Sequence, residues 1–188
     1  MTKFKNTFRI ESAKLKEWDY SNPWYYYVAI NTKNHIHYFG KVKNGDMVLN
    51  DLGMVAETEW LKTKSLRSNV ELDYFVVMPN HFHGIIIING SEVETHRVRL
   101  ANKITKEDAF DVSLRNVKNC LSDIIRGFKS AVTKRIREIG DTNFSWQSRF
   151  YDRIIRNEKE LYNIRKYIEN NPLKWELEKD SPGNIFEL

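Results

Sequence analysis

The chain has 188 residues, of which 41% are hydrophobic and 29% charged, and its formal net charge is +5. This length and composition predict one compact domain over residues 1–188 and exclude fibrous, collagen-like and wholly disordered proteins. The apolar runs are much shorter than the roughly 20 residues of a membrane helix, so we expect no membrane partner. Cys120 has no second cysteine to pair with, and the first residues lack the pattern of a secretory signal, so a cytoplasmic location is expected.

The first elements predicted along the chain are strands and one helix. Residues 24–30 (WYYYVAI) are rich in aromatic and β-branched side chains, which is typical of a strand. Residues 38–42 and 47–49 flank an Asn-Gly turn and therefore indicate a hairpin. Asn50 or Asp51 can cap a helix that is indicated by apolar residues at helical spacing, namely Leu52, Val55, Trp60 and Leu61.

Two more strands follow, at residues 71–78 and 82–88. The second is an almost continuous apolar run, which predicts an interior strand covered on both faces. Residues 89–116 are polar and charged without clear periodicity, so we interpret them as a flexible loop.

Two helices complete the predicted order. Apolar residues at 3.6-residue spacing over 121–139 predict a helix that Gly140 stops. Asn157, with Glu160 three residues later, resembles an N-terminal cap of a last helix, which we expect to end at Pro172. Antiparallel strands with stacked helices predict an α+β fold, ferredoxin-like or RRM-like, with the helices packed on one face of an antiparallel sheet.

Basic residues gather in one part of the chain. Residues 115–166 hold thirteen lysines and arginines against six acidic residues, and several aromatic residues lie among them. This composition suits a polyanion whose bases can stack, although a solvated helical face explains the charge equally well. The candidates for DNA contacts are Arg126, Lys129, Arg149, Arg153, Arg156 and Trp146. For Trp146, a role as a core anchor is an equal alternative.

The sharpest local motif is the pair of histidines His81 and His83. On a strand both project to one side, while Phe82 points to the other side, into the core. Two imidazoles on one face are half of a metal site, although a chance His-x-His pair is expected in about one such sequence in ten. His35 and His37 form a second pair in a polar stretch, which we interpret as a solvated surface pair.

The last helix offers a further ligand. Tyr167 and Asn171 are four residues apart, so they lie one above the other on one face of a helix. If that helix packs on the sheet, both side chains can lie near the two histidines. Alternatively, Tyr167 is a tyrosine at the edge of the core and Asn171 is an ordinary residue near the helix end.

The chain resembles the single-tyrosine transposases of the HUH endonuclease superfamily, in particular the REP-associated tyrosine transposase branch. The resemblance covers about residues 20–176 and depends on the ordered runs MPNHFHGIIII, SDIIRGFKS and WQSRFYDRIIRNEKELYNIRKYIENNPLKW. It implies that His81, His83 and Asn171 hold Mg²⁺ or Mn²⁺ and that Tyr167 is the nucleophile. Tyr151 and Tyr162 are competing candidates for the nucleophile, but neither has a side-chain amide four residues later. Tyr151 is kept as the reserve candidate.

The resemblance also implies an activity. The chain would cleave and rejoin single-stranded or hairpin DNA through a 5′-phosphotyrosine intermediate, in DNA transposition and recombination, as a monomer or homodimer. Two alternatives remain open at this point. One is a catalytically inactive, domesticated descendant that binds nucleic acid, and the other is a metal-dependent nuclease that uses water and does not need Tyr167.

Overall fold

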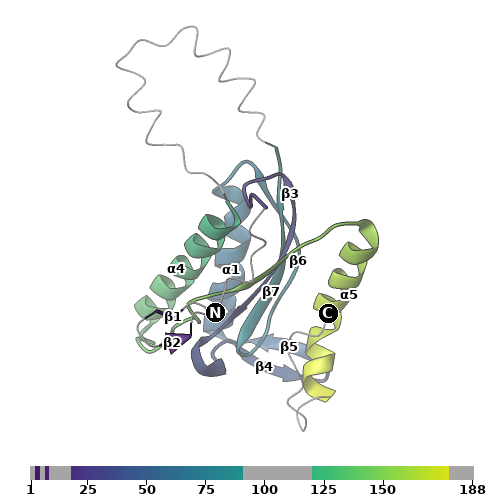
Figure 1. Ribbon diagram of the computed structural model, residues 1–188. Helices are drawn as coiled ribbons and strands as arrows, with labels where there is room; N and C mark the ends of the chain where they lie inside the picture. Colours follow the sequence, from purple (N-terminus) through teal and green to yellow (C-terminus); the bar gives the residue numbers. More distant parts are fainter. Residues whose placement is uncertain (1–2, 5–6, 9–17, 91–119, 178–188) are drawn as a thin grey trace, which may run out of the picture.

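The computed structural model describes residues 3–4, 7–8, 18–90 and 120–177, so the predicted loop lies outside the described residues from residue 91 onward. The helices are α1 (Asp51–Ser65), α4 (Leu121–Ile139), α5 (Glu158–Leu177) and the short 3-10 helix η1 (Lys33–His35). The strands are β1 (Lys3–Phe4), β2 (Thr7–Phe8), β3 (Trp24–Asn31), β4 (Gly40–Lys43), β5 (Asp46–Leu49), β6 (Val70–Val77), β7 (His81–Ile88) and β8 (Tyr151–Ile154) (Figure 1). No helix in the described ranges combines the length and the apolarity needed to cross a membrane.

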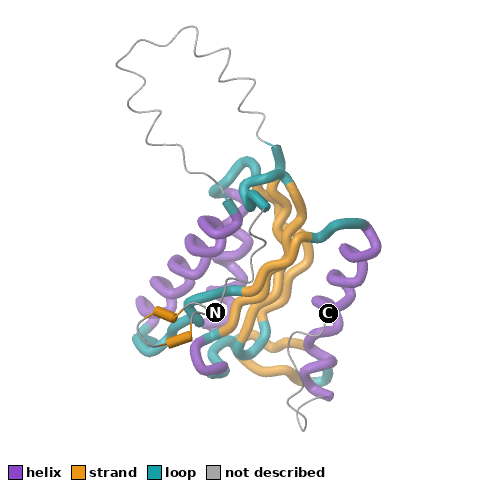
Figure 2. Tube along the Cα trace, viewed as in Figure 1, coloured by secondary structure: helices purple, strands orange, loops and turns teal. Residues whose placement is uncertain are grey.

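The centre of the fold is a four-stranded antiparallel sheet in the order β6-β7-β3-β8. Figure 2 shows this sheet between helices on its two sides. The helix and strand positions predicted from the sequence agree with the structure for β3, β6, β7, α1 and α4. β4 and β5 form a separate hairpin, in which Asn44 and Gly45 have φ values of 55° and 78°, as expected for the Asn-Gly turn.

One face of the sheet is covered by α1 and α4. Trp60 of α1, Phe82 of β7 and Phe128 of α4 form a buried aromatic cluster, with ring centroids 4.5 Å apart for Trp60 and Phe82 and 5.2 Å apart for Phe82 and Phe128. The prediction that Phe82 points into a core is therefore confirmed. Burial of such large rings supplies most of the stabilisation at this contact.

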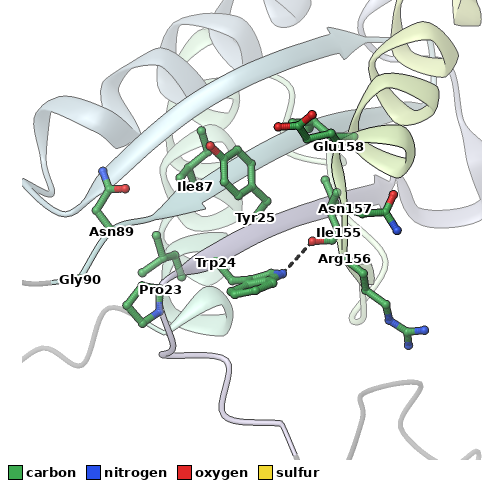
Figure 3. A pocket seen from close by; sticks show the side chains of 12 residues that line it. Pro23, Trp24, Tyr25, Ile87, Asn89, Gly90, Ile155, Arg156, Asn157 and Glu158 are labelled. Atoms are coloured by element: carbon green, nitrogen blue, oxygen red, sulfur yellow. Dashed lines mark hydrogen bonds between the residues drawn. The ribbon is translucent and has the colours of Figure 1, made fainter.

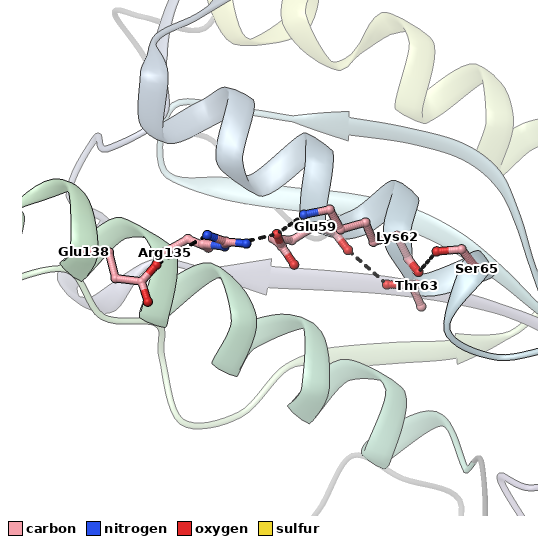
Figure 4. A network of polar contacts seen from close by, with 6 residues as sticks. All are labelled: Glu59, Lys62, Thr63, Ser65, Arg135 and Glu138. Atoms are coloured by element: carbon pink, nitrogen blue, oxygen red, sulfur yellow. Dashed lines mark hydrogen bonds and ion pairs between the residues drawn. The ribbon is translucent and has the colours of Figure 1, made fainter.

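A polar network crosses the outside of the contact between α1 and α4 (Figure 4). Glu59 of α1 accepts a hydrogen bond from Lys62 at 2.7 Å and pairs with Arg135 of α4 at 3.8 Å. Arg135 also pairs with Glu138 at 3.5 Å. Surface ion pairs contribute about 0–1 kcal/mol each, so this network adds little to the buried aromatic cluster.

The other face of the sheet is covered by α5. Ile164 and Ile168 pack on Tyr27, Ala29 and Ile85 in a second buried cluster. The α+β class and the antiparallel sheet are confirmed, and α1 and α4 share one face as expected, whereas α5 lies on the opposite face. The burial of β3 and β7 is consistent with this arrangement, because residues on both faces of these strands are buried and each face requires a cover.

α5 begins as predicted but ends later. Asn157 Oδ1 accepts a hydrogen bond from the Glu160 backbone N–H at 2.9 Å, which confirms the cap. The prediction that the helix ends at Pro172 is wrong, because Pro172 lies inside a helix that continues to Leu177. An internal proline costs about 3 kcal/mol, and the residues beyond it offset this cost by packing on the β4–β5 hairpin. Glu176 contributes there by accepting a hydrogen bond from the Gly45 N–H.

Gly84 of β7 is expected to tolerate no side chain. A Cβ atom there would lie 2.6 Å from Cζ2 of Trp60 and 2.9 Å from the Phe82 ring, so Gly84→Ala must displace the aromatic cluster. We expect urea unfolding to show a loss of about 1–3 kcal/mol in unfolding free energy. The matched control is Gly127→Ala in α4, where a Cβ would meet only the end of the Arg67 side chain and where alanine favours the helix. Equal losses in the two variants would contradict this explanation.

Candidate active site

The four residues of the predicted metal and nucleophile site meet on the α5 side of the sheet. His81 and His83, at the start of β7, have ring centroids 4.6 Å apart. α5 brings Asn171 Oδ1 to 3.3 Å from His81 Nε2, and it brings the Tyr167 ring to 5.3 Å from the His83 ring. Residues that are about 90 positions apart in the chain thus form one cluster. His81, His83 and Asn171 are buried, whereas Tyr167 is half-buried.

Asn80 determines which nitrogen of His81 carries the hydrogen. Asn80 Nδ2 donates a hydrogen bond to the His35 carbonyl oxygen at 3.1 Å, so Asn80 Oδ1 faces His81 Nδ1, at 2.7 Å. His81 Nδ1 must therefore carry the hydrogen, and a neutral ring presents its lone pair at Nε2. Burial lowers the pKa of His81 to about 4, although the nearby Asn171 oxygen, which could accept a hydrogen bond from the protonated ring, acts in the opposite direction. The ring is therefore neutral at pH 7.

The site gathers three polar atoms that lack a matching hydrogen-bond partner. His81 Nε2 and Asn171 Oδ1 face each other at 3.3 Å, and with the lone pair on Nε2 both are acceptors. His83 Nε2 is buried and has no hydrogen-bond partner, and burial, followed by the charge of His81, lowers the pKa of His83. A divalent cation satisfies such a set of atoms, so these residues fit a metal ion. Among the described residues no three His, Cys, Asp or Glu side chains group together, so a third protein ligand in this cluster would have to be the Asn171 amide.

Acid is expected to destabilise the metal-free protein through these two histidines. Their folded pKa values lie below the ordinary value of 6.5, so below about pH 6.5 the unfolded chain binds protons that the folded chain does not. The histidines cost no unfolding free energy above about pH 6.5. Below that pH the unfolding free energy decreases as the pH is lowered, by up to about 1.4 kcal/mol per pH unit for each histidine. Urea unfolding in EDTA between pH 7.5 and pH 5.5 measures this slope. His83→Gln should make the slope of unfolding free energy against pH shallower, whereas His35→Gln, the control at an exposed histidine, should not. Identical slopes in wild type and both variants would show that His83 does not cause the pH dependence.

The other tyrosines lie at different distances from the cluster. Tyr151, the reserve nucleophile, comes from β8, and its ring centroid is 6.3 Å from that of Tyr27. Tyr162 is exposed on α5 beside Lys166, whose Nζ lies 6.0 Å from the Tyr162 ring centroid. A different lysine lies near Tyr167: the Nζ atom of Lys174 is 5.9 Å from the centroid of the Tyr167 ring. The geometry therefore favours Tyr167 over Tyr162 as a nucleophile.

Three residues of the site were missed by sequence reasoning. Asn80 lies within the histidine motif, and its position before His81 was the available signal. Tyr27 joins the site only because β3 pairs with β7, in a register that places Ala29 beside His83. The Trp175 ring lies 5.5 Å from the rings of both His37 and His81, and it does so because α5 continues beyond Pro172.

The residues predicted to contact DNA have diverse surroundings. Arg149 and Arg156 are exposed. Arg126 pairs with Asp123 at 2.7 Å, and Arg153 pairs with Glu160 at 2.6 Å. Lys129 Nζ donates to the carbonyl oxygens of Gln147 and Ser148 at 2.6 and 3.2 Å. Lys129 therefore ties that segment to α4.

Trp146 is part of the core. Its side chain is 8% exposed and packs with the rings of Phe39, Phe128 and Phe144. With its ring faces covered, Trp146 acts as the core anchor that was the alternative to base stacking. Lys129 and Trp146 also line an open groove of about 760 Å³, to which Lys134 and Arg137 contribute exposed positive charge.

A pocket of about 460 Å³ opens at the start of β3 (Figure 3). Trp24 and Tyr25 line it and are 41% and 38% exposed, and Arg156 contributes to its rim. Trp24 Nε1 donates a hydrogen bond to the Ile155 carbonyl oxygen at 2.7 Å, which fixes the indole ring. Tyr25 projects to the same face of β3 as Tyr27, and Trp24 projects to the other face. The pocket therefore lies at the end of the sheet where Trp24 pairs with Ile88, whereas His81 lies at the opposite end of β7.

Comparison with known proteins places the chain in a family. No protein-family model matches it. An uncharacterised protein of Haemophilus influenzae is 34% identical over 165 residues, which are 88% of this chain and 89% of that protein. The two proteins belong to one family. Among solved structures, a REP-associated tyrosine transposase bound to a REP hairpin has a TM-score of 0.55 and 19% identity, over 88% of this chain and 74% of that chain. At that identity the likeness shows a shared fold, which is the fold that the resemblance in the sequence implied.

Proposed function

We propose that this protein is a DNA transposase that cleaves and rejoins single-stranded or hairpin DNA. In this proposal Tyr167 is the nucleophile, and His81, His83 and Asn171 hold Mg²⁺ or Mn²⁺. The observation that carries the proposal is the meeting of a tyrosine with three acceptor side chains, one of which, His83 Nε2, is buried without a partner. The shared fold with a transposase bound to a hairpin supports it.

The chemistry follows from the residue types. When bound, a divalent ion would polarise the phosphodiester as a Lewis acid, and two imidazole ligands favour Mn²⁺ over Mg²⁺. The Tyr167 oxygen forms a bond to phosphorus and gives up its proton, while the bond from phosphorus to the 3′-oxygen breaks and that oxygen takes a proton. The product is a 5′-phosphotyrosine and a free 3′-hydroxyl group. Because one phosphoester replaces another, a later 3′-hydroxyl group can reverse the step and join a new strand.

The protein surface offers further contacts for a DNA strand. Arg149 and Arg156 are exposed cations, and Trp24 and Tyr25 present exposed rings in the pocket beside Arg156. Arginines suit phosphates and aromatic rings suit unpaired bases. These residues replace Trp146 as our candidates for stacking.

The proposed function is tested by labelling hairpin DNA at either end and incubating it with protein and Mn²⁺ on a denaturing gel. A 5′-phosphotyrosine retains the DNA on the 3′ side of the break, so 3′-labelled DNA should give a slowly migrating protein adduct and 5′-labelled DNA a short free fragment. EDTA should abolish both products. Mass spectrometry of the digested adduct should place the nucleotide on the peptide that contains Tyr167.

The same gel distinguishes the alternatives. Free fragments without an adduct would indicate a nuclease that uses water. Tight DNA binding without any cleavage, over several hairpin sequences, would indicate a binding protein that has lost its activity.

A further inference from the structure

Tyr27 lies between the histidine pair and the proposed nucleophile. It occupies the middle of β3 and is 1% exposed. Its hydroxyl oxygen is 2.7 Å from His83 Nδ1, and the two rings are inclined by only 20° with centroids 5.7 Å apart. The Tyr167 ring meets the Tyr27 ring edge to face at 84°, with centroids 6.4 Å apart. The Tyr27 side chain therefore contacts both halves of the site.

We propose that Tyr27 is a positioning residue, whose hydroxyl oxygen accepts the Nδ1–H of His83 and whose hydrogen is donated to the Tyr167 oxygen. This inference rests on the proposed function, because it gives Tyr27 a role in the same metal and nucleophile site.

The direction of the two hydrogen bonds follows from the chemistry of His83. A neutral imidazole has one N–H group and one nitrogen lone pair. Coordination by Nε2 requires the lone pair there, so Nδ1 carries the hydrogen and the Tyr27 oxygen accepts it. The Tyr27 O–H group then remains available to donate, and in this proposal its acceptor is the oxygen of Tyr167, whose ring packs against Tyr27. Asn80 plays the corresponding part for His81, where its Oδ1 accepts the Nδ1–H at 2.7 Å.

The arrangement has a consequence for each end of the site. Metal-binding histidines whose second nitrogen loses its fixed partner typically lose 10- to 100-fold in metal affinity. At the nucleophile, the hydrogen bond donated by Tyr27 would orient the Tyr167 oxygen. It would also stabilise the negative charge that this oxygen carries during the attack on phosphorus. Tyr27 keeps its own proton, so the proton of Tyr167 passes to solvent or to a base.

The variant that tests this inference is Tyr27→Phe, and Tyr26→Phe is its matched control. Tyr26 is the preceding residue of β3 and is also fully buried, but it faces α1 and α4 and bonds to Trp18 Nε1 and the Asn22 carbonyl oxygen. Each variant loses one buried hydroxyl group from the same strand. We expect the electron paramagnetic resonance signal of unbound Mn²⁺ to show about 10- to 100-fold weaker binding by Tyr27→Phe and wild-type affinity for Tyr26→Phe. Even at saturating Mn²⁺, Tyr27→Phe should form the DNA adduct more slowly than wild type does.

A second measurement needs no variant. Nitrogen-15 spectra of the wild-type protein report which imidazole nitrogen carries the hydrogen, and His83 should be the Nδ1–H form; an Nε2–H form would overturn the inference. Equal Mn²⁺ affinity and equal adduct rates in wild type and Tyr27→Phe would overturn it while leaving the proposed function in place. A wild-type protein that neither binds Mn²⁺ nor forms an adduct would overturn both.

Discussion

Replacing Tyr167 with phenylalanine is expected to abolish the covalent protein–DNA adduct while DNA binding persists. The substitution removes the oxygen that, in our proposal, forms the bond to phosphorus, and it keeps the ring that packs on His83 and Tyr27. Loss of a nucleophile lowers turnover by many orders of magnitude in other enzymes, so we expect a decrease of at least about 10³-fold in adduct formation. The labelled-hairpin gel measures the decrease, and a DNA-binding titration shows that the fold and the DNA surface remain intact.

Two other tyrosines provide the controls for this experiment. Tyr162 lies on the same helix but is 60% exposed, so Tyr162→Phe should form adducts at the wild-type rate. Tyr151 contacts Tyr27 from β8, so Tyr151→Phe distinguishes the reserve nucleophile from the first candidate. An adduct that survives in Tyr167→Phe and disappears in Tyr151→Phe would transfer the nucleophile to β8. Cleavage that continues in both variants without any adduct would indicate that the protein is a hydrolase and not a transposase.

Local periodicity predicted the elements that carry the site. The two-residue period of a strand placed His81 and His83 on one face and Phe82 on the other, and the structure confirms it. The 3.6-residue period of residues 121–139 predicted α4 to the residue. These patterns succeed because one face of each element is buried against the same core over its whole length.

Tertiary contacts determined what local patterns could not. β8 is four residues long and includes Asp152 and Arg153, and it becomes a strand only because β3 offers an unpaired edge. Pro172 disfavours a helix locally, but the contacts of the following residues with the β4–β5 hairpin keep α5 helical. The side of the sheet that α5 covers also follows from packing. That packing brings Tyr167 and Asn171 to the histidines, which the helical spacing predicted only on the condition that the last helix packs on the sheet.

Replacing His83 with leucine is expected to remove the metal response of the protein without weakening its metal-free fold. His83 is fully buried, and its Nε2 has no hydrogen-bond partner, which costs about 1–3 kcal/mol for a buried polar group. Leucine removes that cost, and in our proposal the Tyr27 hydroxyl group that it leaves behind still donates to Tyr167, whose ring packs against Tyr27. Thermal melting in EDTA should therefore show a midpoint equal to or above that of wild type. Adduct formation on hairpin DNA should be lost, because the cation has lost a ligand.

The metal response separates this explanation from a general effect on stability. A ligand present at 100 times its dissociation constant stabilises the folded state by about 2.7 kcal/mol, so Mn²⁺ should raise the melting temperature of wild type and not that of His83→Leu. His37→Leu is the matched control, since His37 is exposed and belongs to the second histidine pair, and it should respond to Mn²⁺ as wild type does. A full Mn²⁺ response in His83→Leu would show that the ion binds elsewhere. The lone pair of His83 Nε2 would then need another partner, and the role of the histidine pair in catalysis would have to be abandoned.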